Sequence, residues 1–138
     1  MSYFNDEQAV YEYLGQLFVN LLGAPELAAK FNRANTIVQF EYRAPASQIT
    51  VKLIEGEEGQ VDLGPTELEP EVVMTMDADL AHRFWLGKVN VAMAMMRGQI
   101  KTQGPIAKVL TLAPLVSEVS PRYRAQLEAA GLADLIEV

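Results

Sequence analysis

Alternation of apolar and polar residues marks several short segments of the chain. Apolar side chains occupy every second position at 38–42 and again at 49–53, and each segment predicts a strand with one buried face. A shorter strand is expected at 61–63, after a turn that contains two glycines and suits a hairpin. Two more strands are expected at 72–76 and 99–103. The pattern therefore predicts five strands.

Helical periodicity covers much of the remaining chain, with apolar residues three or four positions apart. Helices are expected at 6–22, from Pro25, at 77–87, at 89–97, from Pro105 and from Ser120. The apolar tail at 132–138 either covers the core or lies over an opening. Because no linker or repeat interrupts this order, we expect an α+β fold, with one domain over residues 1–138 and helices segregated about one mixed sheet.

The stretch 72–104 contains five methionines and the only tryptophan. The methionines are Met74, Met76, Met93, Met95 and Met96. Their flexible thioether chains repack around apolar partners of different shape, so this stretch is interpreted as the lining of an apolar cavity. The same residues also fill ordinary cores, and spacing alone does not separate the two interpretations. In the short helix at 89–97, the Val89, Met93 and Met96 stripe is expected to face the ligand space.

The order of signals in this stretch resembles the sterol carrier protein 2 family. A strand is followed by Asp, a helix ending in Gly-Lys, a short apolar helix, Met-Arg-Gly and an Ile-Lys strand closing on Gly. The matching residues are Asp77, Leu80, Leu86, Gly87, Lys88, Ala94, Met96, Gly98, Ile100, Lys101 and Gly104. The resemblance spans about residues 5–130. Thr102 and Pro105 depart from the pattern, where an apolar and an acidic residue are usual.

The resemblance implies a curved, mostly antiparallel five-stranded sheet that forms a hydrophobic tunnel with several helices. It further implies non-catalytic binding or intracellular transfer of a long-chain lipid, such as a fatty acid, acyl-CoA, a sterol-like molecule or an isoprenoid. The alternative is an accessory module that holds an apolar intermediate for enzymes of a lipid or isoprenoid-quinone pathway through protein contacts. The expected ligand-binding residues are Met74, Met76, Leu80, Phe84, Trp85, Val89, Met93, Met96, Ile100, Ile106 and Leu110.

Composition narrows the range of partners. Eighteen acidic against 11 basic residues give a formal charge of -7, which disfavours nucleic acid and allows at most transient membrane contact. Cations group at Arg122 and Arg124 and at Lys88, Arg97 and Lys101, where we expect ordinary solvated surface. The absence of cysteine, of a signal peptide and of a long apolar segment favours a cytoplasmic protein of bacterial or archaeal type. A protein partner is compatible with this composition, which leaves the oligomeric state open.

The sequence contains few residues or motifs that are typical of catalytic sites. No nucleophile turn, phosphate-binding loop or His-rich metal pattern is present. The sole histidine, His82, follows Asp79 by three positions, and we expect the two on an exposed helix face. Glu55, Glu57 and Glu58 are expected to keep a turn solvated rather than to bind metal. We therefore expect no enzyme activity, no catalytic or metal-binding residue and no cofactor.

Overall fold

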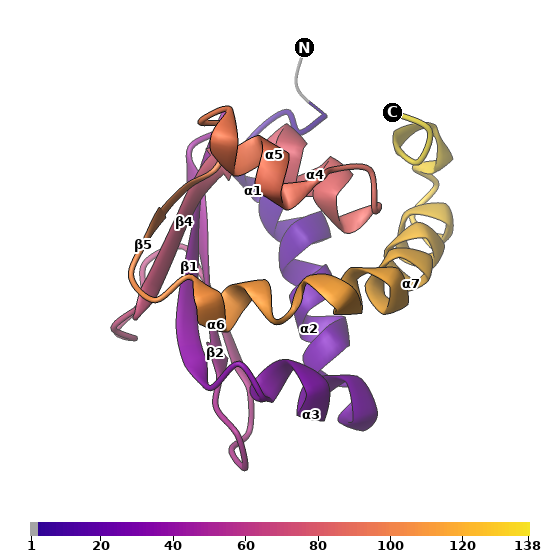
Figure 1. Cartoon of the computed structure of the whole chain (residues 1–138). Helices are drawn as coiled ribbons and strands as arrows, with labels where there is room; N and C mark the ends of the chain where they lie inside the picture. The colour runs from indigo at the N-terminus through magenta and orange to yellow at the C-terminus, as the bar shows by residue number, and fades with distance from the viewer. Residues whose placement is uncertain (1–2) are drawn as a thin grey trace.

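A computed structural model describes residues 3–138 and shows a five-stranded sheet with helices packed on one face (Figure 1). The strands are β1 (Thr36–Arg43), β2 (Ser47–Leu53), β3 (Gln60–Leu63), β4 (Val72–Asp77) and β5 (Lys101–Gln103). They lie in the order β3-β2-β1-β4-β5, and only the β1–β4 pair is parallel. The prediction of five mostly antiparallel strands in an α+β fold is confirmed.

Strands β1 and β4 form the centre of the sheet and bury alternate side chains. Phe40 lies beside Met74, and Tyr42 lies beside Met76, across the parallel ladder. All four side chains are buried. Because successive side chains of a strand point to opposite faces, this register gathers the apolar residues of both strands on the side covered by helices.

The N-terminal helical run extends over the length that the periodicity predicts, but it is not uniform. It consists of α1 (Glu7–Val10), a π-helical segment η1 (Tyr11–Gly15) and α2 (Gln16–Leu22). The side chain of Asp6 accepts a hydrogen bond from the Ala9 amide at 2.9 Å and caps the start. The wider π turn leaves no clear sequence signal, because Tyr11–Gly15 follows the same apolar spacing as its neighbours.

Helix α3 (Pro25–Asn32) begins at the predicted proline, and the remaining helices follow β4. They are α4 (Ala78–Trp85), α5 (Val91–Met96), α6 (Ala107–Leu110), η2 (Ala113–Leu115), α7 (Val116–Ala129) and η3 (Ala133–Leu135). The predicted helix start at Ser120 is wrong, because α7 already begins at Val116 and contains Pro121. The proline is tolerated because the carbonyl that loses its amide partner belongs to Ser117, an exposed residue.

The C-terminal tail covers the core beside α4, which decides between the two interpretations of this segment. Ile136 is buried. The Lys88 ammonium group donates hydrogen bonds to the carbonyls of Ile136 at 2.6 Å and Val138 at 3.1 Å. The tail is therefore fixed to Lys88, which follows α4, and none of its residues lines the cavity described below.

Candidate functional site

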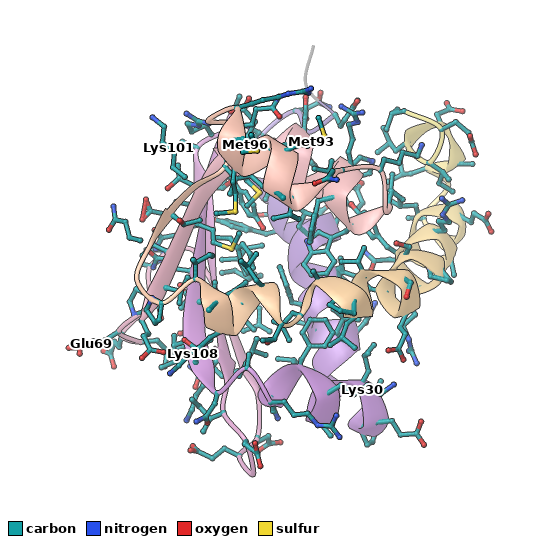
Figure 2. All side chains as sticks on the ribbon, viewed as in Figure 1. Lys30, Glu69, Met93, Met96, Lys101 and Lys108 are labelled. Carbon is teal, nitrogen blue, oxygen red and sulfur yellow. The ribbon has the colours of Figure 1, made fainter. Side chains whose placement is uncertain are left out.

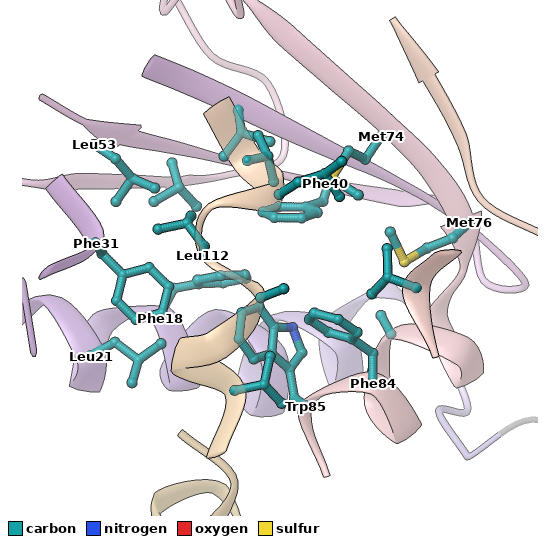
Figure 3. A pocket seen from close by; sticks show the side chains of 18 of the residues that line it. Phe18, Leu21, Phe31, Phe40, Leu53, Met74, Met76, Phe84, Trp85 and Leu112 are labelled. Carbon is teal, nitrogen blue, oxygen red and sulfur yellow. The ribbon is translucent and has the colours of Figure 1, made fainter. Parts of the chain in front are cut away.

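A cavity of about 60 Å³ lies between the sheet and the helices (Figure 3). Its lining side chains are all apolar or aromatic, and none carries a charge. They are Phe18, Leu21, Leu22, Phe31, Val38, Phe40, Tyr42, Val51, Leu53, Met74, Met76, Ala81, Phe84, Trp85, Val91, Ile100, Val109, Leu110, Leu112, Ala113 and Val116. An apolar concave site of this kind is suited to a hydrocarbon ligand.

Aromatic contacts hold the side of the cavity that faces α2 and α4. The Phe18 ring stacks on Phe40 with a centroid distance of 5.3 Å and meets Trp85 edge-on at 5.5 Å. Phe84 packs edge-on against Trp85 at 4.8 Å. Figure 3 shows these rings on both sides of the cavity, with Met74 and Met76 on the sheet side. Such pairs stabilise a fixed arrangement beyond their apolar burial.

The inner wall (residues 72–85) and the roof (residues 89–115) are two parts of the chain that border the cavity, and together they contain the five methionines of the 72–104 stretch. The inner wall comprises β4 and α4, and the roof comprises α5, β5, α6 and η2. No residue of α6 or η2 is buried, although both elements contribute side chains to the cavity. Leu110 lines the cavity and is 40% exposed. Leu110 therefore lies at the rim, where the cavity approaches solvent.

One polar group in the cavity lining has no partner. The Tyr42 hydroxyl is buried and makes no hydrogen bond within residues 3–138. Burial, reinforced by the nearby Tyr123 phenol, raises the pKa of Tyr42 far above its usual range, so the group stays neutral. The site therefore contains neither a charge nor an acid–base pair, and its chemistry is that of apolar binding.

Six of the 11 residues predicted to bind ligand line this cavity. These are Met74, Met76, Phe84, Trp85, Ile100 and Leu110. The cavity lining does not include Leu80, Val89, Met93, Met96 and Ile106.

The predicted orientation of α5 is wrong. Met93 is 45% exposed and Met96 is 87% exposed, whereas Ala94 is buried. The Asn90 side chain accepts a hydrogen bond from the Met93 amide at 3.1 Å, and the helix that starts there turns Val91 and Ala94 inward. Residues three apart share a helix face, so this phase places Met93 and Met96 outside.

Sequence reasoning missed the lining residues outside the 72–104 stretch except Leu110, and it also missed Ala81 and Val91 inside the stretch. Phe18 and Phe31 come from α2 and α3, and Val38, Phe40 and Tyr42 come from β1. Alternation did predict which face of β1 is buried. It carried no signal that this face borders a cavity rather than a filled core.

His82 lies outside the cavity lining, and the prediction that it occupies an exposed face is wrong. It is fully buried, with Nε2 2.8 Å from the Leu135 carbonyl oxygen and Nδ1 2.7 Å from the Tyr123 hydroxyl. Since a carbonyl only accepts, Nε2 carries the proton and Nδ1 accepts from Tyr123. Burial lowers the pKa of His82, partly offset by the bond to Leu135, which makes this ring a neutral connector between α4, α7 and the tail.

Comparison with known proteins identifies the family. The model of the SCP-2 sterol transfer family matches residues 16–117, which is most of the chain. The chain belongs to the SCP-2 sterol transfer family. This confirms the resemblance seen in the sequence. No curated protein matches the sequence.

Solved structures with the same fold include three relevant relatives. The sterol carrier protein 2 of Yarrowia lipolytica, in its apo form, is 18% identical with a TM-score of 0.62, covering 78% of this chain and 89% of that one. The sterol carrier protein domain 2 of Helicoverpa armigera is 22% identical with a TM-score of 0.64, covering 81% and 88%. UbiJ-SCP2, a ubiquinone synthesis protein, is 16% identical with a TM-score of 0.56, covering 81% and 96%. At these identities the likeness establishes a shared fold.

Among residues 3–138, no helix combines the length and apolar character needed to cross a bilayer.

Proposed function

We propose that this chain binds the hydrocarbon part of a long-chain lipid in the cavity between the sheet and the roof, without chemical conversion. The observation that carries this proposal is the cavity lining, which is apolar except for the Tyr42 hydroxyl and is assembled mainly from the sheet, α2, α3, α4 and the roof. A catalytic function would need a positioned acid, base or nucleophile facing the substrate. The only lining residue with a hydroxyl group is Tyr42, which stays neutral.

The expected affinity follows from the apolar surface of the ligand. Burying about 15 methylenes at roughly 0.8 kcal/mol each contributes about 12 kcal/mol before the costs of immobilisation. Those costs offset several kcal/mol, which leaves a Kd in the range of roughly tens of nanomolar to micromolar.

The cavity must enlarge to accept such a ligand. Its volume of about 60 Å³ is well below the roughly 300–1,000 Å³ of typical small-molecule sites. The roof is the part best suited to move, because α6 and η2 contain no buried residue, whereas the central strands β1 and β4 each have a paired strand on both sides. Ligand entry therefore involves outward displacement of Leu110 and its neighbours.

A pair of alanine substitutions tests where the ligand lies. Ala81 and Ala94 are both 2% exposed, but only Ala81 lines the cavity. In Ala81→Leu the added carbons enter the cavity, so the affinity for a fluorescent long-chain fatty acid should fall at least tenfold with little change in melting temperature. In Ala94→Leu the added carbons meet a filled core, so the protein should lose about 1–3 kcal/mol of stability and keep its affinity for the fatty acid.

Two results would contradict the proposal. The first is the absence of saturable binding of the fatty acid by wild type. The second is an equal loss of affinity in Ala81→Leu and Ala94→Leu, which would place the ligand elsewhere. Mass spectrometry of an organic extract of the purified protein then identifies the lipid that it carries.

The second candidate is an accessory role in which the chain holds an apolar intermediate, such as an isoprenoid quinone precursor, for the enzymes of a pathway. The observation favouring it is the fold shared with UbiJ-SCP2, a ubiquinone synthesis protein. Both candidates expect a bound lipid. Affinity capture with the whole chain separates them, because an accessory module co-purifies with enzymes, whereas an independent carrier exchanges lipid between vesicles in their absence.

A further inference from the structure

Charge is distributed unevenly along this acidic chain. Residues 80–117 contain five cations and no aspartate or glutamate. All 18 acidic residues lie in the remainder, against six cations there. The cationic segment includes the whole roof, so the part of the protein that covers the cavity has the opposite charge from the rest.

Three of these cations, Arg83, Arg97 and Lys101, are exposed and form no ion pair within the described residues. Arg83 lies on α4, outside the roof. Arg97 follows α5, and Lys101 begins β5. Lys108, by contrast, pairs with Glu71 at 3.0 Å, and the Lys88 ammonium group is bound by the carbonyls of the tail. Arg97 and Lys101 are therefore available for an external anion.

The exposed methionines of the roof lie close in the sequence to Arg97, which caps α5, and to Lys101, which begins β5. Met93 and Met96 are on the outer side of α5, directly before Arg97. Figure 2 shows both methionines on the outside of α5, with Lys101 projecting from the same end of the molecule. Large exposed apolar side chains beside unpaired cations are typical of a surface that meets a lipid headgroup region.

We propose that the docking face, formed by Met93, Met96, Arg97 and Lys101, binds reversibly to the surface of an anionic lipid bilayer. The cations attract the headgroups, and the two methionines enter the boundary between headgroups and acyl chains. The acidic remainder of the chain is repelled by the same surface, so only the roof approaches it. The net charge of -7 for the whole chain does not reveal this cationic face.

Docking on this face brings the cavity to the membrane. The inner side of the same segment contributes Val91, Ile100 and Leu110 to the cavity lining, and Leu110 lies at the rim. A bilayer in contact with the docking face thus meets the segment whose inner side lines the cavity. Loading of a cavity ligand at this place rests on the proposed lipid binding, whereas attachment to vesicles does not.

Co-sedimentation with vesicles tests the docking face. Wild type should bind vesicles that contain about 30% phosphatidylglycerol, bind phosphatidylcholine vesicles at least tenfold more weakly, and dissociate in about 0.5 M NaCl. Arg97→Glu combined with Lys101→Glu should lower binding to the anionic vesicles at least tenfold. The matched control is Arg33→Glu combined with Arg122→Glu, which makes the same charge change at two exposed residues outside the segment. The control should lose no more than about threefold.

A second variant tests the methionines without changing charge. Met93→Ser combined with Met96→Ser should weaken binding to the anionic vesicles several-fold while leaving the salt dependence intact. Titration of each variant with fluorescent fatty acid in the absence of vesicles should give the wild-type affinity.

The outcomes separate the two proposals. An equal loss of vesicle binding in the roof and control charge-reversal variants would contradict the docking face. So would a wild-type protein that does not bind anionic vesicles and binds an acidic protein instead. Vesicle binding that follows the docking face, with no fatty acid binding in solution, would leave the docking face standing and contradict the proposed function.

Discussion

The inner wall and the roof both contain methionines and both border the cavity, but their methionines are placed differently. In the inner wall, Met74 is 6% and Met76 is 4% exposed. In the roof, Met93 is 45% and Met96 is 87% exposed. The same residue type therefore lines the cavity in one part and faces solvent in the other. The hydrophobicity of methionine therefore does not decide whether the side chain is buried. The backbone element that carries it does.

The backbone of each part explains this difference. β4 pairs with β1 on one side and β5 on the other, so its phase is fixed by two ladders of hydrogen bonds. α5 is only six residues long, and a helix of that length packs through one or two positions. Val91 and Ala94 take those positions, and the larger methionines remain outside.

Charged substitutions should give the largest contrast between the two parts. Met76→Glu places a carboxylate in a cavity with no cation, so we expect a loss of more than about 3 kcal/mol of unfolding free energy, or failure to fold. Met96→Glu, at an exposed position, should change it by less than about 0.5 kcal/mol. Urea unfolding measures both. Similar losses at the two positions would mean that α5 is packed against the core in solution.

His82 makes the inner wall rigid on the side opposite the cavity, and its loss should have the next largest effect. His82→Ala leaves the Leu135 carbonyl and the Tyr123 hydroxyl unpaired and opens a void, so we expect a loss of about 2–4 kcal/mol. Ligand affinity should stay within about twofold, because His82 does not line the cavity. A loss below about 0.5 kcal/mol would restore the exposed position expected from the sequence.

The same residue predicts a pH dependence of stability. The pKa of His82 is lowered in the folded state, so the unfolded chain takes up its proton first as the pH falls. The contribution of the neutral ring is therefore fully present above about pH 6.5 and declines as the pH falls below that value. Because His82 is the only histidine, His82→Gln should flatten the change in unfolding free energy between about pH 7 and pH 5. Identical pH profiles for wild type and variant would exclude this titration.

Gly104 tests how firmly the roof is attached to the sheet. It joins β5 to the loop before α6, has a φ of +91°, and a Cβ there would overlap the Glu71 carbonyl oxygen. Gly104→Ala should therefore cost about 2–3 kcal/mol of unfolding free energy. Gly98→Ala is the control, since it has a φ of +73° and open space around it, and should cost only about 1 kcal/mol. Equal losses of unfolding free energy in the two variants would show that the backbone around Gly104 shifts easily to accept a Cβ atom.

The sequence predicted the elements that repeat a simple pattern. All five strands and the buried face of β1 follow from alternation, and α3 begins at its proline. What it missed depends on tertiary contacts. The burial of His82 depends on the Leu135 carbonyl, which is 53 residues away in the chain, and the phase of α5 depends on which of its residues pack against the core. Six candidate site residues line the cavity because they lie on the predicted strands and helices, and most of the missed ones come from α2, α3, β1 and β2.

The smallest change in unfolding free energy is expected for a substitution of Tyr42, and the sign of this change is what tests the structure. The buried hydroxyl of Tyr42 has no hydrogen-bond partner within residues 3–138, whereas that of Tyr123 bonds to His82 at 2.7 Å. Tyr123→Phe removes a satisfied bond and should cost about 1–2 kcal/mol of unfolding free energy. Tyr42→Phe removes only a desolvated hydroxyl, so the unfolding free energy should stay unchanged or rise by up to about 1 kcal/mol. Thermal melting of the two variants compares them directly. A clear loss in Tyr42→Phe would mean that this hydroxyl has a partner in solution, most simply water or a lipid oxygen held inside the cavity.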